Sequence, residues 1–290
     1  MASLADIRKR ISSVKNTQKI TKAMKMVSAA KLRKAQERIT NLRPYAHGLL
    51  TVIADIAATH RVDHPLLTVK PNPKNLLLVV VTSDRGLCGS FNSAVIKFAE
   101  QYIKEKKPNY DVFDIIFVGK RGADYFKNRD ILGKETILNL ARELTFDMCS
   151  EIAEQIKKQY ATGEYDEVQI VYNEFKSAIQ QDVVNESILP VDLSRSEIDA
   201  EESSFANDLI FEPGPEEMVD ELLDRHFATQ IFRVMSESVA SEHGARMSAM
   251  ENSTKNAGEM IHSMTLTYNK LRQEAITTEL VEIISGAESV

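Results

Sequence analysis

The chain of 290 residues has no tryptophan, only 7% aromatic residues and no long hydrophobic run. A helix that spans a membrane needs about 20 consecutive apolar residues, so the chain does not cross one by itself. The N-terminal stretch lacks the apolar core of a secretory signal and leads without a break into a patterned helix, so we interpret it as mature protein. Few aromatics among many Lys, Glu, Ala and Met favour long helices over a thick globular core.

Recognisable catalytic and metal-binding patterns are also missing. Cys88 and Cys149 fit neither a metal spacing nor a disulfide framework, and the six histidines show no ligand spacing such as H-E-x-x-H. Neither G-x-S-x-G nor the phosphate-binding pattern G-x-x-x-x-G-K-[ST] occurs. We therefore expect no catalytic residue, no cofactor and no metal ion, and a mechanical or scaffolding role instead.

Charge is distributed unevenly along the chain. Residues 1–50 carry twelve Lys and Arg against two acids, whereas residues 191–224 carry twelve Asp and Glu against one base. Such polarity indicates partners of opposite sign at the two ends. For the basic N-terminal face three interpretations stay open: a solvated surface, an acidic protein partner, or a nucleic-acid or anionic membrane surface.

Helical periodicity covers residues 2–56 and returns from Pro215 almost to the end of the sequence. The C-terminal pattern has no further proline, and some seventy residues would form a rod of roughly 100 Å. A rod of that length must be paired, and the N-terminal helix supplies a narrow apolar stripe typical of a coiled coil. We predict that the stripe contains Leu4, Ile7, Ile11, Val14, Ile20, Met24, Val27, Leu32, Ala35, Ile39 and Leu42, with interruptions at Gln18, Thr21, Lys25 and Ser28.

The C-terminal helix changes character along its length. Its middle, residues 236–258, is rich in Ser, Ala, Gly and Met, which lets two helices approach closely but holds them weakly. Its far end is apolar over much of its girth, at Ile276, Leu280, Val281, Ile283 and Ile284. Because no domain of this chain remains to cover that tip, we expect another protein to enclose it.

The residues between the two helices alternate between strand and helix patterns. We predict strands at 76–81, 113–118, 167–172 and about 182–189, and helices at 93–106, 119–128 and 145–160. This alternation predicts a small α/β domain with a largely parallel sheet. After the first strand, Gly86 and Gly89 would allow a tight turn, while Asp84 and Arg85 would fix the loop by charge-assisted hydrogen bonds. A nucleotide bound at this loop is the alternative.

Four segments together resemble the gamma subunit of F-type ATP synthase, in its bacterial form. They are KITKAMKMVSAAKLRKA (19–35), TSDRGLCGSFN (82–92), ARMSAMENSTKNAG (245–258) and YNKLRQEAITTELVEIISGA (268–287). The resemblance implies an antiparallel two-helix coiled coil with an inserted Rossmann-like α/β domain. The implied divisions are 1–60 for the N-terminal helix, 75–195 for the α/β domain and 212–287 for the C-terminal helix.

The same resemblance implies a function. The chain would be the central rotor shaft, non-catalytic itself, seated among three alpha and three beta subunits and bound to the epsilon subunit and the membrane c-ring. Its place would be the cytoplasmic side of the bacterial plasma membrane. The implied partner contacts are Lys22, Met24, Lys25, Arg246, Gln273, Thr277, Glu279 and the apolar tip residues Ile276, Leu280, Ile283 and Ile284. The rival from another class is a nucleic-acid-binding coiled coil that uses the basic arm.

Overall fold

The computed structural model describes residues 4–60, 64–140, 144–193 and 214–288, so most of the acidic stretch lies outside the described residues. The chain forms two compact units. Unit 1 comprises residues 1–29 and 246–290, and unit 2 comprises residues 30–245. Two long helices contribute to both units, α1 (Leu4–His60), which runs on through Pro44, and α5 (Pro215–Glu288). Both long helices were predicted.

Unit 2 contains a five-stranded sheet in the order β3-β2-β1-β4-β5. Strands β1 to β4 are parallel and β5 is antiparallel to β4, which confirms a largely parallel sheet. The sequence analysis missed β3, because three residues are too few to show a pattern. The strands are β1 (Asn75–Val81), β2 (Val112–Val118), β3 (Glu135–Ile137), β4 (Glu167–Phe175) and β5 (Gln181–Leu189).

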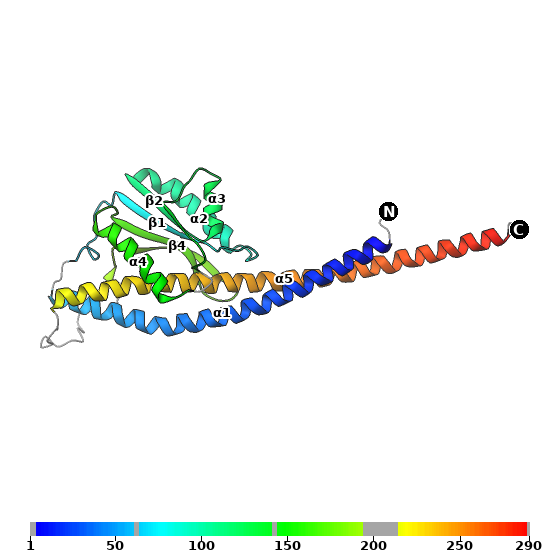
Figure 1. Ribbon diagram of the computed structural model, residues 1–290, viewed down its shortest axis with the longest axis horizontal. Helices are drawn as coiled ribbons and strands as arrows, with labels where there is room; N and C mark the ends of the chain where they lie inside the picture. Colours follow the sequence, from blue (N-terminus) through cyan, green and yellow to red (C-terminus); the bar gives the residue numbers. More distant parts are fainter. Residues whose placement is uncertain (1–3, 61–63, 141–143, 194–213, 289–290) are drawn as a thin grey trace. The chain divides into compact units, whose positions relative to one another are not determined.

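Helices cover both faces of this sheet (Figure 1). Because side chains alternate along a strand, Leu78 and Val80 of β1 pack on one face with α2 and α3. Leu77 and Val79 pack on the other face with α4 and the unit 2 parts of α1 and α5. Burial on both faces explains why β1 is a continuous apolar run. The short helices are α2 (Phe91–Lys106), α3 (Lys120–Lys127), α4 (Phe146–Ala161) and the 3-10 turn η1 (Lys107–Asn109).

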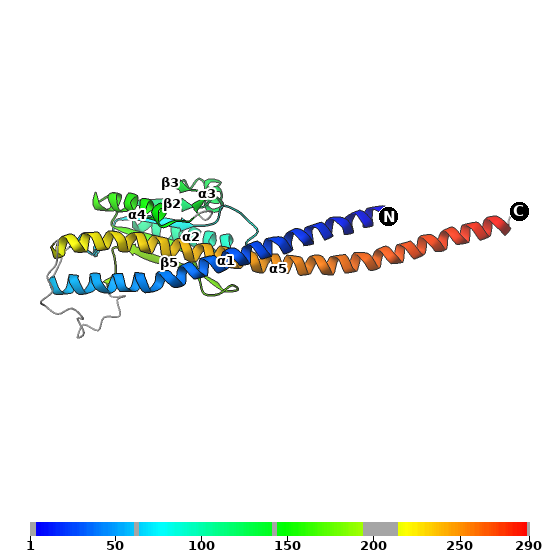
Figure 2. The ribbon, with the colours of Figure 1, turned by 60° about the horizontal axis from the view of Figure 1, so that its bottom comes forward.

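Helix α4 lies beside α5 within unit 2 (Figure 2). Thr145 caps its first turn by accepting a hydrogen bond from the Met148 backbone N–H at 3.3 Å. Lys157 then pairs with Asp220 and Asp224 on α5. His64 Nε2 contacts the same Asp220 at 3.1 Å, which ties the segment after α1 to the beginning of α5.

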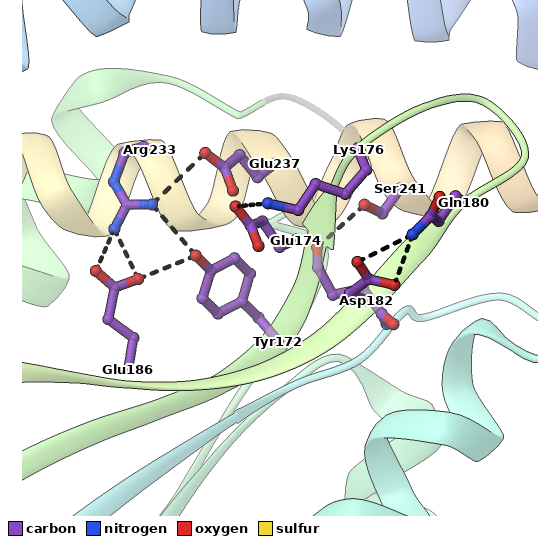
Figure 3. A network of polar contacts seen from close by, with 10 residues as sticks. Tyr172, Glu174, Lys176, Gln180, Asp182, Glu186, Arg233, Glu237 and Ser241 are labelled. Atoms are coloured by element: carbon purple, nitrogen blue, oxygen red, sulfur yellow. Dashed lines mark hydrogen bonds and ion pairs between the residues drawn. The ribbon is translucent and has the colours of Figure 1, made fainter.

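A buried ionic network joins α5 to the last two strands (Figure 3). Arg233 donates to both carboxylate oxygens of Glu186 at 2.8 Å and to the Tyr172 hydroxyl at 3.2 Å. Glu237 lies 3.5 Å from the same guanidinium, and the three charged side chains are at most 18% exposed. Burial raises the pKa of the Tyr172 hydroxyl well above its usual value, so it stays protonated. The network fixes α5 against β4 and β5.

Candidate partner-binding surfaces

In unit 1, α1 and α5 are paired along one line of side chains that recur at three- and four-residue steps. We call this line the seam, and the predicted coiled coil is confirmed. The seam contains Ile7, Ile11, Val14, Gln18, Thr21, Lys25 and Ser28 on α1, and Met250, Thr254, Ala257, Ile261, Met264, Tyr268 and Leu271 on α5; all are buried or half-buried.

The prediction that Ile20, Met24 and Val27 lie in the seam was wrong for Ile20 and Val27, while Met24 is half-buried. Ile20 is 59% exposed and Val27 is 57% exposed, whereas Thr21 and Ser28 are buried. A strict seven-residue count from Ile7 places the polar residues inside and the aliphatic ones outside, and it would have found this arrangement. Hydrophobicity alone assigned the wrong face because the seam is polar here.

Three polar contacts cross the polar part of the seam. The Thr21 and Thr254 hydroxyls lie 2.8 Å apart, and Gln18 donates to the Thr254 carbonyl at 3.4 Å. Lys25 Nζ lies 2.6 Å from a Glu251 carboxylate oxygen. One turn beyond Thr254, a Cβ on Gly258 would lie 3.1 Å from Gln18 Nε2, so the helices approach closely there. These contacts give one antiparallel register.

Large apolar side chains point away from the seam. On α1, Met26 is 61% exposed beside the exposed Ile20 and Val27, and on α5 Met260 and Leu266 are 49% and 59% exposed. Sequence reasoning missed these five as surface residues. A groove of about 700 Å³ opens between the helices, lined by Gln18, Lys19, Lys22, Lys25, Met26, Glu251, Thr254 and Lys255. The outside of unit 1 is therefore apolar and basic, a composition suited to a protein partner.

The structure separates the implied contact residues of the shaft into two kinds. Lys22 is exposed on α1, but Met24 is half-buried and Lys25 is engaged with Glu251. Arg246, at the edge of unit 1, is only 8% exposed. Thus Lys22 has a freely accessible side chain, whereas the other three are partly or largely covered.

The far end of α5 is a single exposed helix. The seam register places Leu4, where α1 begins, near Leu271, and every described side chain from 272 to 287 is exposed. Gln273, Thr277 and Glu279 lie on this stretch, and the Thr277 hydroxyl donates only to the Gln273 carbonyl of its own helix at 2.9 Å. The apolar residues Ile276, Leu280, Ile283 and Ile284 are 46–62% exposed. This tip offers an apolar surface with no packing partner among the described residues.

In unit 2, the loop after β1 is held by its first acidic residue. The two carboxylate oxygens of Asp84 accept backbone hydrogen bonds from Lys120 at 3.1 Å and Asn139 at 3.0 Å. Arg85 is exposed, and a Cβ on Gly86 would lie 3.0 Å from the Arg121 guanidinium. Gly89 has a φ of 57°, which glycine adopts without strain. Asp84 thereby connects the loop to the ends of two other strands.

The carboxyl ends of parallel strands are where doubly wound α/β folds bind ligands. Here Met235, Ser238, Val239 and Glu242 of α5 lie over the ends of β1 and β2 and leave a cavity of about 20 Å³. Counted as space open to the centres of water-sized spheres, about 10–15 Å³ is enough for one water molecule, so this cavity holds little more than that. Helix α5 thus occupies the volume that a nucleotide would need.

No described group of three His, Cys, Asp or Glu side chains is placed to hold a metal ion. None of the described helices is long and apolar enough to cross a membrane.

Two long terminal helices that pair as a coiled coil, with an α/β domain inserted between them in the sequence, define a class of protein. A family model described as "ATP synthase" matches residues 3–290. The chain is 58% identical over 293 residues to the ATP synthase gamma chain of Bdellovibrio bacteriovorus, covering 100% of this chain and 99% of that one. It is 48% identical over 290 residues to that of Geobacter metallireducens, with the same coverage. The chain belongs to the ATP synthase gamma-chain family, the central stalk of the F-type enzyme, as the resemblance predicted.

Solved structures agree with this assignment. A chain of the Tetrahymena thermophila mitochondrial ATP synthase, from its central stalk and c-ring, is 31% identical, with a TM-score of 0.62 over 80% of this chain and 98% of its own length. A chain of the Euglena gracilis mitochondrial ATP synthase rotor is 25% identical, with a TM-score of 0.63 over 94% of this chain and 98% of its own. The rival reading as a nucleic-acid-binding coiled coil finds no support in these comparisons.

Proposed function

We propose that this chain is the rotating shaft that couples proton-driven turning of a membrane c-ring to ATP synthesis or hydrolysis on beta subunits. Its partners would be three alpha and three beta subunits, the epsilon subunit and the c-ring. The observation that carries the proposal is the inverted patterning of unit 1. Its seam is polar at Thr21 and Ser28, while Ile20, Met26 and Val27 face outward. Apolar side chains that gather on the outside of a thin helix pair mark a surface for binding another protein.

The shaft would act by differential contact and not by chemistry of its own. Its outer surface differs from side to side, since Lys22 belongs to a basic groove whereas Met260 and Leu266 lie on α5. Each surrounding beta subunit would therefore meet a different face at each angle, and its nucleotide affinity would change as the shaft turns. Rotation would then drive the three sites in sequence through binding, reaction and release.

The contact residues fall into two groups in this proposal. Lys22 would pass acidic loops of the beta subunits, and Met24, Arg246, Gln273, Thr277 and Glu279 would be the shaft residues that meet beta-subunit loops. The tip residues Ile276, Leu280, Ile283 and Ile284 would turn in an apolar collar. Asp84, Arg85, Gly86 and Gly89 would hold the unit 2 loop in a fixed shape. The segments 1–60, 75–195 and 212–287 are proposed as shaft, α/β domain and shaft.

The proposed location is the cytoplasmic side of a bacterial plasma membrane, where the chain would be attached only through the complex. The bacterial relatives named above support a bacterial form. No catalytic residue is assigned to this chain, because the nucleotide chemistry would take place on the beta subunits.

Co-purification tests the proposal. The chain is expressed with its alpha and beta subunits, the chains in the complex are counted, and steady ATPase activity is measured with and without it. We expect one copy among three of each, with sustained ATPase activity only when it is present. Failure to join the ring, together with duplex DNA binding that persists at moderate salt, would overturn the shaft and favour the nucleic-acid reading.

A tip variant sharpens this experiment. Ile283→Glu places a charge in the proposed collar, and burying an unpaired charge is strongly unfavourable, so we expect weaker assembly with the ring. Ile283→Val keeps the side chain apolar and serves as the matched control. Equal assembly of both variants would contradict the role of the tip.

A further inference from the structure

Lys25 and Glu251 form an ion pair across the seam of unit 1, with Nζ and Oε1 2.6 Å apart and the side chains 38% and 57% exposed. We propose that this pair sets the register of α1 against α5, so that Lys25 is a positioning residue for coupling and does not act by touching a partner. The inference rests on the proposed shaft function and assigns one residue a different role within it. An exposed pair adds little stability, so its value must lie in specificity.

Apolar packing does not define the register in this part of the seam. After Val14, the α1 positions are Gln18, Thr21, Lys25 and Ser28, and the α5 seam positions alongside them are Met250, Thr254 and Ala257, of which only Met250 is a large apolar residue. In coiled coils, large aliphatic side chains inserted between their neighbours supply stability, and polar residues at seam positions specify register at a cost in stability. The groove of about 700 Å³ beside the pair shows how little packing is present.

The charges around the groove favour one register over its neighbours. Among the residues that line it, Glu251 is the single acid beside Lys19, Lys22, Lys25 and Lys255. A slip of one turn, about 5.4 Å, would bring Lys25 opposite Lys255 in one direction and Met247 in the other. The first slip puts like charges together, and the second loses the pair. The observed register is the one that satisfies Lys25.

The hydroxyl contact supports the same register independently. Thr21 and Thr254 lie one turn from Lys25 and Glu251 and are 2.8 Å apart, so both contacts are made together or lost together. The register also fixes how high Ile20 and Met26 of α1 stand relative to Met260 of α5. A slip would shift the exposed residues of α1 along those of α5, and partners would then meet a different arrangement of apolar side chains.

The proposed function of the Lys25–Glu251 pair is to resist sliding of the two helices when the shaft carries torque. A load applied to one helix of a shaft reaches the other helix only through the seam. Where aliphatic side chains do not interlock, a directional contact such as an ion pair must resist sliding. Lys25 would therefore affect coupling as strongly as Glu251 does, although the two project from different helices and would meet different partner surfaces.

Charge reversal tests the inference in the complete ATP synthase reconstituted in vesicles, with proton pumping per ATP hydrolysed as the measurement. Lys25→Glu and Glu251→Lys each place like charges across the seam, and we expect each to lower this ratio about twofold or more. The double variant K25E/E251K restores an opposite pair and should recover the wild-type ratio. The double variant K22E/E251K has the same net charge without a restored pair and should not recover.

Each other outcome overturns the inference. If K25E/E251K is no better than K25E, Lys25 acts on a partner and not on Glu251. If K22E/E251K recovers equally, only the net charge matters. If a single variant fails to assemble, assembly becomes the measurement. Recovery of assembly in K25E/E251K but not in K22E/E251K then supports the inference, and any other result overturns it.

A disulfide bond across the seam provides a second test, because it would fix the register without restoring any contact between Lys25 and a partner protein. Because the Thr21 and Thr254 hydroxyls are 2.8 Å apart, sulfur atoms in their places come within bonding reach. The variant K25E/T21C/T254C is oxidised with diamide, which takes up the two electrons and two protons that the thiols lose as the disulfide forms. We expect pumping to recover on oxidation and to fall again on reduction. The native Cys88 and Cys149 are buried. Disulfide formation without recovery would overturn the inference.

The controls keep the two proposals apart. If the wild-type chain neither enters the ring nor supports pumping, the shaft function itself fails. If the wild type pumps and K25E pumps equally well, the shaft stands and only the register role of Lys25 is lost.

Discussion

The two units of this chain use opposite patterning. In unit 2, β1 is buried on both faces, and Ile53 of α1 belongs to the core with Val79 and Phe227. In unit 1, the polar Thr21 and Ser28 are buried while Ile20 and Val27 of the same helix are exposed. Helix α1 thus follows the inside-apolar rule within unit 2 and departs from it in unit 1 between residues 18 and 28. The difference indicates that unit 2 is stabilised by its own core, whereas unit 1 is shaped for the proteins around it.

Removing a buried charge should give the largest effect. Arg233→Met would leave Glu186 and Glu237 without their cation, and breaking such a pair costs about 3–5 kcal/mol of unfolding free energy. Lys25→Met at the exposed pair of unit 1 should cost under about 1 kcal/mol. Urea unfolding of the purified chain measures both. A similar loss in the two variants would remove the contrast between buried and exposed ion pairs.

A matched pair of isoleucines on α1 tests the apolar contrast. Ile53 is fully buried and Ile20 is 59% exposed. Ile53→Ala should lower the free energy of unfolding by about 2–5 kcal/mol because it leaves a cavity in the core. Ile20→Ala should change it by no more than about 0.5 kcal/mol. The same unfolding measurement compares them, and equal losses would mean that Ile20 packs within the isolated chain.

Acid should destabilise unit 2 through His226. Burial, and then the charge of Arg233, lower the pKa of this histidine from 6.5 to about 4. Between those pH values the unfolded chain binds a proton that the folded chain does not, so stability falls as the pH drops from 6.5 to 4, by up to about 3 kcal/mol. The free energy of unfolding, measured at several pH values across this window, should depend less on pH in His226→Gln than in the wild type.

His262 is the control for this effect, because it is exposed on α5 within unit 1. His262→Gln should keep the wild-type acid dependence. If His226→Gln keeps it as well, other groups cause the loss, and the buried histidine does not contribute as its environment predicts.

Much of unit 2 could be predicted from the sequence. Continuous apolar runs predicted β1 and β2, because a strand buried on both faces has no alternation to obscure it. Strand β3 was missed, since Glu135, Thr136 and Ile137 have no pattern and are placed by pairing with β2. The position of α5 over the strand ends depends on contacts between distant segments, and no local pattern predicts such contacts.

The surfaces of unit 1 were harder to predict. The apolar tip was predicted because Ile283 and Ile284 belong to an aliphatic cluster at the far end of α5, and no other described residue covers them. The seam was assigned wrongly at Ile20 and Val27, because hydrophobicity identifies a buried face only where the chain covers itself. Where partner proteins supply the cover, position in the seven-residue repeat is the better guide. Lys25 shows the same limit, since its link to Glu251 requires knowing which acid lies across the seam.

Making the seam of unit 1 apolar should change stability least, and it tests most directly why the two units are patterned differently. Thr21→Val with Thr254→Val replaces both hydroxyls that contact each other by groups of the same shape. Removing both partners of a hydrogen bond is nearly neutral or stabilising, so the local pairing should gain up to about 1 kcal/mol. Amide hydrogen exchange in residues 4–29 should slow about fivefold at most. Faster exchange would show that the hydroxyl pair is needed for stability.

The expected gain separates stability from function. If the helices pair more tightly in this double variant but the reconstituted enzyme pumps fewer protons per ATP, the polar seam is retained for register and not for strength. A pair of valines makes no hydrogen bond, so it specifies the register less strictly than the Thr21–Thr254 contact and the Lys25–Glu251 pair do together. A variant that is both more stable and fully coupled would show instead that any tight seam suffices. Unit 1 would then differ from unit 2 only in where its apolar side chains find cover.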